Sequence, residues 1–164
     1  TVAHKDSTGG EGTITVNEIQ RMTAGKGILH SEFNASNTEI LKLLQIWLIP
    51  NKQGLMPSYE QMKFSHEEKK NKLLKVVSGK KEDGIIFINQ DAEIFLSDLD
   101  ARIKLNYEVK DKRGVYIQLV DGTLIVNGNK VEKGDALRIT NEKNLELIAE
   151  KNAKIVLFDI TLEF

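Results

Sequence analysis

Apolar and polar residues alternate along much of the second half of the chain. Residues 102–109 show the pattern clearly, because Ile103, Leu105, Tyr107 and Val109 occupy every second position and are expected to face a core. Further short apolar stretches recur at spacings of about 8 to 12 residues with turn formers between them, which predicts an all-β sandwich, jelly roll or barrel. The other strands expected in this half are residues 85–88, 93–96, 115–120, 123–126, 136–140, 145–149 and 154–160.

The turns of the second half carry residues that suit sharp reversals. Asn127-Gly128 lies between two apolar stretches, and this dipeptide favours the tight turn of a β-hairpin. Asp121-Gly122 and Lys133-Gly134-Asp135 are similar breaks. These turns support the prediction of consecutive antiparallel strands.

The first half has fewer regular patterns. Residues 1–6 are expected to be extended, and the glycine-rich residues 7–12 are expected to reverse the chain. Thr13–Val16 alternates polar and apolar residues and predicts a half-buried strand. Residues 51–64 show no clear period and are expected to be irregular.

The most apolar stretch of the chain is Leu41–Ile49, which ends at Pro50. Such a continuous apolar run predicts a central strand with both faces covered. Trp47, the only tryptophan, is therefore expected to pack in the core of the first half.

A helix is expected between the two halves. Ser65 and Glu68 have the spacing of a capping box, so a short helix is predicted from His66 to about Lys75. The polar, glycine-flanked residues 78–84 then form a connector. The predicted organisation is a first domain over residues 1–64, a helix and connector over 65–84, and a second domain over 85–164.

Composition excludes several classes of function. The 164 residues, 40% of them hydrophobic, can bury a core in one large or two small domains. A net charge of −1 gives no electrostatic reason to expect binding to nucleic acid or to an anionic membrane. The absence of cysteine excludes disulfides, cysteine-ligated zinc and a thiol nucleophile. No apolar run has the roughly 20 residues of a transmembrane helix, and the expected location is cytoplasmic.

Residues 25–32, Gly-Lys-Gly-Ile-Leu-His-Ser-Glu, carry the main candidate chemistry. If Ile28–Phe33 is extended, His30 and Glu32 lie on one face, one pleat apart. An imidazole and a carboxylate suit divalent iron, manganese, nickel or zinc. Two donors make half of a typical site, and the alternative is a half-buried histidine that is hydrogen-bonded to its neighbours.

The second half contains no histidine, and its acidic residues fall mostly in turns or on outward faces. No metal-binding or acid–base cluster is therefore expected after residue 84. The second half is predicted to be a structural module that supports the first.

Several ordered segments resemble the pirin family, in its bacterial quercetinase-like branch. The most specific is Met22–Glu32, with the sequence Met-Thr-Ala-Gly-Lys-Gly-Ile-Leu-His-Ser-Glu. The others are Ala3–Ser7, Gln20-Arg21, Leu44–Trp47, Val126–Gly128, Gly134-Asp135 and Leu157–Asp159.

The resemblance implies a bicupin, which is a pair of tandem jelly-roll β-barrels, with metal in the first barrel alone. Pirins hold one iron ion with a His-x-His pair and a His-x-Glu pair, and the second pair corresponds to His30 and Glu32. The implied cofactor is Fe²⁺ or another divalent transition metal. Glu32 is also implied as the catalytic proton acceptor from a substrate hydroxyl.

The His-x-His pair of the family belongs upstream of the segment that aligns with Val2 and His4, and the chain begins at Thr1. We therefore expect a fragment whose first barrel is incomplete. His4 and Asp6, also two residues apart, are the alternative source of the two remaining ligands. The exposed edges of the barrel are expected to be completed by an N-terminal fragment or by a swapped partner.

The function that the resemblance implies is that of a quercetin 2,3-dioxygenase, which opens the ring of a flavonol-like polyphenol with dioxygen. One alternative is a redox-sensitive regulatory module, as in eukaryotic pirins. Another is a truncated, metal-free remnant without activity.

Overall fold

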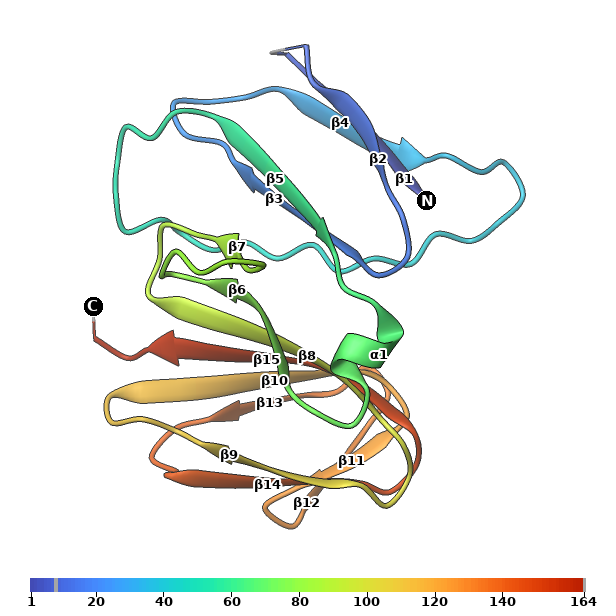
Figure 1. Ribbon diagram of the computed structural model, residues 1–164, viewed down its shortest axis with the longest axis vertical. Helices are drawn as coiled ribbons and strands as arrows, with labels where there is room; N and C mark the ends of the chain where they lie inside the picture. The colour runs from blue at the N-terminus through green and yellow to red at the C-terminus, as the bar shows by residue number, and fades with distance from the viewer. Residues whose placement is uncertain (8, 164) are drawn as a thin grey trace. The chain divides into compact units, whose positions relative to one another are not determined.

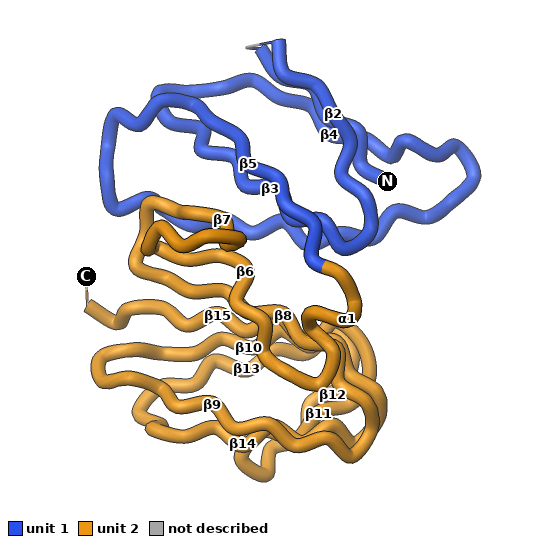
Figure 2. Tube along the Cα trace, viewed as in Figure 1, with its two compact units in different colours: residues 1–64 blue, residues 65–164 orange. Residues whose placement is uncertain are grey.

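The computed structural model describes residues 1–7 and 9–163 (Figure 1). The chain divides into two compact units, Thr1–Phe64 and Ser65–Phe164 (Figure 2). Strands β1 to β15 and one short helix, α1, account for the regular structure of the described residues. The predicted all-β fold class is therefore confirmed.

The first unit contains two small antiparallel sheets. The expectation of extended structure in residues 1–6 is confirmed by β1, whereas the strand predicted at Thr13–Val16 begins earlier, at Glu11. The prediction that residues 51–64 are irregular is wrong at β5 (Ser58–Lys63), because this strand pairs with β3 (Glu18–Thr23) along its whole length. The three-stranded sheet has the order β2-β1-β4 (Glu11–Ile14, Val2–Asp6, His30–Asn34), and the two-stranded sheet joins β3 (Glu18–Thr23) to β5 (Ser58–Lys63).

The predicted central strand at Leu41–Ile49 is wrong. Residues 40–50, all of which the structure describes, form no helix or strand. The side chain of Trp47 is 88% exposed instead of lying in a core. An apolar run becomes a buried strand only when neighbouring strands pair with its backbone and cover its faces. Neither described sheet of the first unit includes residues 40–50 among its strands.

The predicted capping box is confirmed, but the helix is shorter than expected. The Ser65 backbone N–H donates to the Glu68 carboxylate at 2.7 Å, and the Glu68 N–H donates to the Ser65 hydroxyl at 3.3 Å. Helix α1 nevertheless spans only His66–Lys69. β6 (Leu74–Ser78) follows, because its apolar residues gain more from pairing with β8 (Ala92–Leu99) and joining the core than from continuing the helix.

Residues 65–84, expected to be a helix and connector, contribute α1 and β6 to the second unit. Across residues 1–7 and 9–163 no helix is both long and apolar enough to cross a membrane.

The second unit is built from two facing sheets (Figure 1). Among its described residues every strand pair is antiparallel except that of β6 with β7. The larger sheet has the order β13-β10-β15-β8-β6-β7 (Ala136–Ile139, Arg113–Asp121, Ala153–Thr161, Ala92–Leu99, Leu74–Ser78, Ile86–Phe87), and the smaller has the order β12-β11-β14-β9 (Asn129–Glu132, Thr123–Val126, Asn144–Ala149, Lys104–Glu108).

The core of the second unit lies between these sheets and follows the predicted alternation. Ile117 and Leu119 of β10 lie beside Leu157 of β15 on the inner face of the larger sheet, in one core cluster with buried residues of β14 such as Leu147. The inward positions predicted in residues 102–109 are also confirmed. Val109 lies within the same core, and Ile103, Leu105 and Tyr107 pack against it. Alternate side chains from both sheets thus fill one continuous apolar layer.

The hairpin predicted at Asn127-Gly128 is confirmed. Both residues have positive φ angles, 45° and 80°, which is the conformation of the tightest hairpin turns. The turn joins β11 to β12, and Val126 pairs with Asn129 across it.

Replacing Leu119 by alanine should lower the free energy of unfolding by about 2–5 kcal/mol, because the deleted side chain leaves a cavity in a fully buried site. Urea denaturation followed by far-ultraviolet circular dichroism measures the change. Val120→Ala is the matched control on the same strand. Val120 is 38% exposed, so its truncation should change stability by only about 0.5 kcal/mol. Equal losses in the two variants would contradict the assignment of the core.

Candidate functional site

The turn that precedes β4 positions His30 and Glu32. Gly25 has a φ of +57°, and a Cβ atom at this position would collide with the backbone carbonyl of Leu55. Glycine is therefore required both for the turn and for this close approach. The chain then enters β4, where His30 and Glu32 occupy alternate positions and share one face of the sheet, as predicted. Both residues are solvent-exposed.

The register between β1 and β4 adds two further side chains to this face. His4 lies directly opposite Glu32, and Asp6 lies directly opposite His30. Side chains that oppose each other in an antiparallel pair project from the same face. The result is a two-by-two array of imidazoles and carboxylates, in which each histidine faces an acid across the strands.

His4 is the most buried member of the array, with 9% of its surface exposed. Its ring stacks on that of Tyr59, with centroids 5.7 Å apart, and its Nε2 lies 2.8 Å from the Gln20 amide nitrogen. With this amide as donor, the proton of neutral His4 lies on Nδ1. Nδ1 is buried and has no hydrogen-bond partner within residues 1–7 and 9–163. Buried N–H groups normally have a hydrogen-bond partner, so Nδ1 of His4 is available to donate a hydrogen bond to a further group.

Tyr59 is a member of the site that the sequence did not predict. It lies on β5, with its hydroxyl buried. Burial raises the pKa of Tyr59, and the carboxylates of Asp6 and Glu32 raise it further. The phenol therefore stays protonated at neutral pH and can donate a hydrogen bond. No period in the surrounding residues indicated a strand, so the sequence offered no signal for this side chain.

Two donors of this array suit a divalent transition metal, namely the His30 imidazole and the Glu32 carboxylate. The part of the chain that the structure describes contains no group of three or more His, Cys, Asp or Glu side chains placed to hold a metal ion. His4 and Asp6 share the face with the predicted pair but do not complete a ligand set. The donor chemistry of His30 and Glu32 suits a divalent transition metal, but two donors are fewer than the three or four of an established site.

A shallow hollow of about 290 Å³ lies beside the array. Asp6 and His30 both line it, so the predicted donor His30 is accessible from this side. The other lining residues are Lys5, Ser7, Leu29 and Ser31.

Two family models match the sequence. The model described as Pirin covers residues 1–48, and that of the quercetinase C-terminal cupin domain covers residues 75–160. A protein of Escherichia coli (strain K12) named quercetin 2,3-dioxygenase is 36% identical over 160 residues, which are 98% of this chain and 68% of that relative. The chain belongs to the pirin family. A pirin-like protein of Caulobacter vibrioides is a more distant relative, 29% identical over 96% of this chain and 68% of its own length.

Solved structures agree with this assignment. The crystal structure of YhhW from Escherichia coli matches this pirin with a TM-score of 0.91 and 35% identity, over 97% of this chain and 67% of that one. A structure of bacterial pirin YhhW in complex with nickel(II) gives a TM-score of 0.91 at 34% identity, over 98% and 68% of the two chains. The predicted bicupin fold is thereby confirmed, with the pirin chain spanning about two thirds of these relatives.

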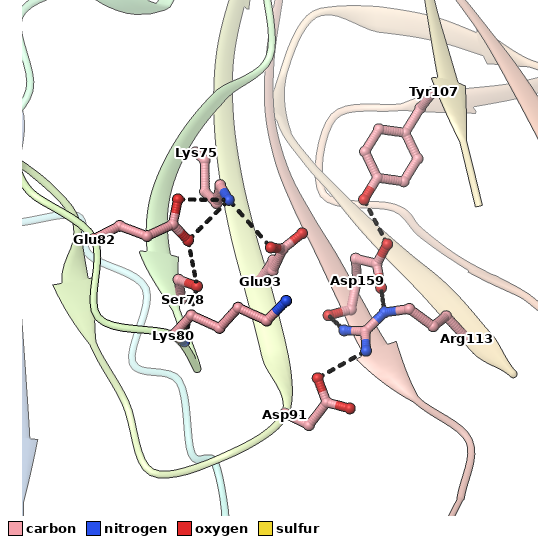
Figure 3. Close-up of polar contacts among 9 residues, drawn as sticks. All are labelled: Lys75, Ser78, Lys80, Glu82, Asp91, Glu93, Tyr107, Arg113 and Asp159. Atoms are coloured by element: carbon pink, nitrogen blue, oxygen red, sulfur yellow. Dashed lines mark hydrogen bonds and ion pairs between the residues drawn. The ribbon is translucent and has the colours of Figure 1, made fainter. Parts of the chain in front are cut away.

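The sequence analysis did not anticipate a buried cluster of acidic, basic and phenolic side chains in the cupin unit of this pirin (Figure 3). Asp159 is 1% exposed. Its carboxylate accepts a hydrogen bond from the Tyr107 hydroxyl at 2.5 Å and forms an ion pair with Arg113. Arg113 also donates to the Asp159 carbonyl oxygen at 3.0 Å and to Asp91 at 2.8 Å.

A second group of charges adjoins this cluster through Glu93 of β8, which pairs with Asp159 of β15 (Figure 3). Lys75 donates to Glu82 at 3.0 Å and to Glu93 at 3.1 Å, and the Ser78 hydroxyl donates to Glu82 at 2.9 Å. Burial alone would lower the pKa of Lys75, but the two carboxylates raise it. Lys75 and Ser78 in turn lower the pKa of Glu82. The charged and hydroxyl groups of these residues are hydrogen-bonded to one another, so we interpret them as stabilising the fold.

Asp159→Ala should destabilise the second unit by about 3–5 kcal/mol, because it leaves the largely buried Arg113 guanidinium without its main counter-charge. Thermal or urea unfolding measures the loss. The control is Glu150→Gln, which disrupts the exposed ion pair with Lys130 and should cost less than about 1 kcal/mol. A loss no greater than that of the control would show that the buried cluster contributes little to stability.

Burial, followed by the hydrogen bond to Asp159, strongly raises the pKa of Tyr107. A raised folded pKa stabilises the protein at neutral pH, and this contribution should fade as the pH rises above the ordinary tyrosine value of about 10. Tyr107→Phe should therefore make stability fall less steeply with pH in the alkaline range. Unfolding at a series of alkaline pH values tests this expectation, with Tyr116→Phe as the control. An unchanged slope in Tyr107→Phe would refute it.

Proposed function

We propose that this pirin is the metal-binding part of a dioxygenase that opens the ring of a flavonol-like polyphenol, as in a quercetin 2,3-dioxygenase. His30 and Glu32 would bind Fe²⁺ or another divalent transition metal. The observation that carries the proposal is the shared face of these two donors on β4, opposite His4 and Asp6. The name of the 36% identical relative and the nickel(II) complex of bacterial pirin YhhW support it.

The residues of the array have distinct parts in this proposal. Glu32 accepts the proton of a substrate hydroxyl at a carboxylate oxygen, which makes the substrate a better electron donor. Tyr59 remains neutral beside Asp6 and Glu32 and donates a hydrogen bond on this face. A bound divalent metal would supply the Lewis acidity and redox chemistry that bring together a substrate oxygen and dioxygen.

One observation favours a second candidate, a form of the chain that holds no metal by itself. The described residues provide no three-donor group. Two protein ligands hold a metal weakly, whereas established sites use three or four. The remaining donors would then come from outside these 164 residues.

Metal binding tests the proposed ligands directly. Titration of the chain with Ni²⁺, followed by calorimetry, should show weak binding that His30→Ala and Glu32→Gln each reduce by about tenfold or more. His66→Ala is the matched control, because His66 is an exposed histidine on α1 in the other unit. If the His30 variant bound Ni²⁺ as well as the wild type, His30 would not be a ligand.

Oxygen uptake with quercetin tests the reaction. Uptake that requires both added Fe²⁺ and His30 would support the dioxygenase. Metal binding at His30 with no uptake would overturn the proposed activity and favour the redox-sensitive regulatory module.

A further inference from the structure

His4 lies on the middle strand of its sheet, between Gly12 of β2 and Glu32 of β4. A Cβ atom at Gly12 would come within 2.9 Å of the His4 Nε2, so a larger residue there would displace the ring. The Tyr59 ring stacks on the imidazole. Gly12 and Tyr59 together hold the imidazole in a fitted position.

The Nε2 of His4 lies at the end of a chain of side-chain hydrogen bonds. The Gln20 amide nitrogen is 2.8 Å from this Nε2 and also donates to the Gln61 side-chain oxygen at 3.3 Å. The Gln61 amide nitrogen donates to the Thr13 carbonyl oxygen at 3.0 Å and to the Glu18 carboxylate at 3.2 Å. The chain therefore runs from Glu18 through Gln61 and Gln20 to the imidazole.

The acceptors at the far end fix the direction of every bond in this chain. The Thr13 carbonyl oxygen can only accept a hydrogen bond. The Glu18 carboxylate also only accepts, and a backbone hydrogen bond lowers the pKa of Glu18, which keeps it ionised at neutral pH. Gln61 must therefore direct its NH₂ group toward these acceptors and its oxygen toward Gln20. Gln20 then donates one N–H to Gln61 and the other to the imidazole.

This chain fixes the tautomer of neutral His4. Because Nε2 accepts a hydrogen bond from Gln20, the ring proton lies on Nδ1. A neutral histidine binds a metal ion through a nitrogen that carries no proton. Nδ1 carries the proton and Nε2 is occupied by Gln20, so neither nitrogen is available as a third ligand beside His30 and Glu32.

The Nδ1–H of His4 is a buried donor that needs an acceptor, since it has no hydrogen-bond partner within residues 1–7 and 9–163. Glu32 is directly opposite on β4, and opposed side chains in an antiparallel pair have Cβ atoms about 4.5–5.5 Å apart. The Glu32 side chain is exposed, and its hydrogen bond from Gln45 is long, at 3.4 Å. Exposed side chains change rotamer rapidly, so the carboxylate can turn toward Nδ1.

We propose that His4 is a positioning residue for Glu32. Its Nδ1–H, fixed by the chain through Gln61 and Gln20, donates to the Glu32 carboxylate when that carboxylate binds a divalent metal. Ligating carboxylates are themselves hydrogen-bonded in metal sites, which orients them. The inference deepens the proposed function and rests on it, because it requires Glu32 to be a ligand.

The tautomer is tested without metal. The chain has three histidines, so the His30→Ala/His66→Ala variant leaves His4 alone. Nitrogen NMR of isotopically labelled histidine at about pH 9, where an ordinary histidine is neutral, should show the proton on Nδ1. Gln20→Leu in this background should lower the population of that tautomer, whereas Gln53→Leu, at an exposed glutamine of the same unit, should leave it unchanged. A proton on Nε2 before the Gln20 change, or no response to it, would refute the tautomer.

A double-mutant cycle tests the action of His4 through Glu32. His4→Phe keeps an aromatic ring beside Tyr59 but removes the N–H, and it should weaken Ni²⁺ binding by about tenfold or more in calorimetry. In a Glu32→Ala background the same substitution should have little further effect, because the acceptor is gone. His4→Asn, which keeps an N–H near the position of Nδ1, should bind Ni²⁺ more tightly than His4→Phe. Far-ultraviolet circular dichroism checks that each variant keeps the fold.

The outcomes separate this inference from the proposed function. Equal Ni²⁺ binding by the wild type and His4→Phe would overturn the positioning role and leave His30 and Glu32 as ligands. An equal loss on His4→Phe with and without Glu32 would also overturn it, because His4 would then act independently of Glu32. No Ni²⁺ binding by the wild type would overturn the ligand assignment, and the role of His4 with it.

Discussion

A β-strand is stable only when its backbone is paired and one of its faces is buried, and the two units of this pirin meet this requirement to different degrees. In the second unit two sheets enclose Ile117, Leu119, Leu147 and Leu157, with alternate side chains from each sheet. In the first unit the two sheets are small, and the most apolar stretch of the chain remains outside them. The buried apolar layer therefore explains the regular strands of the second unit. In the first unit the apolar run at Leu41–Ile49 is not enclosed by two sheets, which explains why the predicted strand does not form there.

The chemistry of the first unit depends on strand register. Because Glu32 pairs with His4 and His30 pairs with Asp6, a shift of one residue between β1 and β4 would send one strand's donors to the opposite face. The register places two candidate ligands beside a buried imidazole and the phenol of Tyr59. Pairing of main-chain groups thus determines which side chains can act together.

Sequence patterns correctly predicted the features that depend on residues close together in the chain. The alternation at Ile103 to Val109, the Asn127-Gly128 turn and the shared face of His30 and Glu32 all follow from short-range geometry, and the structure agrees with each. The failures involve distant partners. Leu41–Ile49 has the sequence of a strand but joins neither described sheet of the first unit. The helix expected to reach Lys75 gives way to β6, because β8 lies alongside.

The missed polar residues divide into two kinds. Asp159 continues the inward phase of Ile155 and Leu157, so the alternation contained a signal that it is buried and needs partners. Tyr59 had no such signal, because its role arises from the approach of β5 to His4. The burial of a carboxylate can be inferred from its position in an alternating strand pattern. A contact between side chains of two sheets can be found only once the fold is known.

The close approach at Gly25 links separate parts of the first unit. It brings the turn before β4 against the backbone of Leu55 and Met56, near the end of the long excursion that follows β4. Any larger residue at position 25 would push these backbones apart and move the start of β4 with them. The contact at Gly25 therefore couples the position of the loop at Leu55 and Met56 to the start of the strand that carries His30 and Glu32.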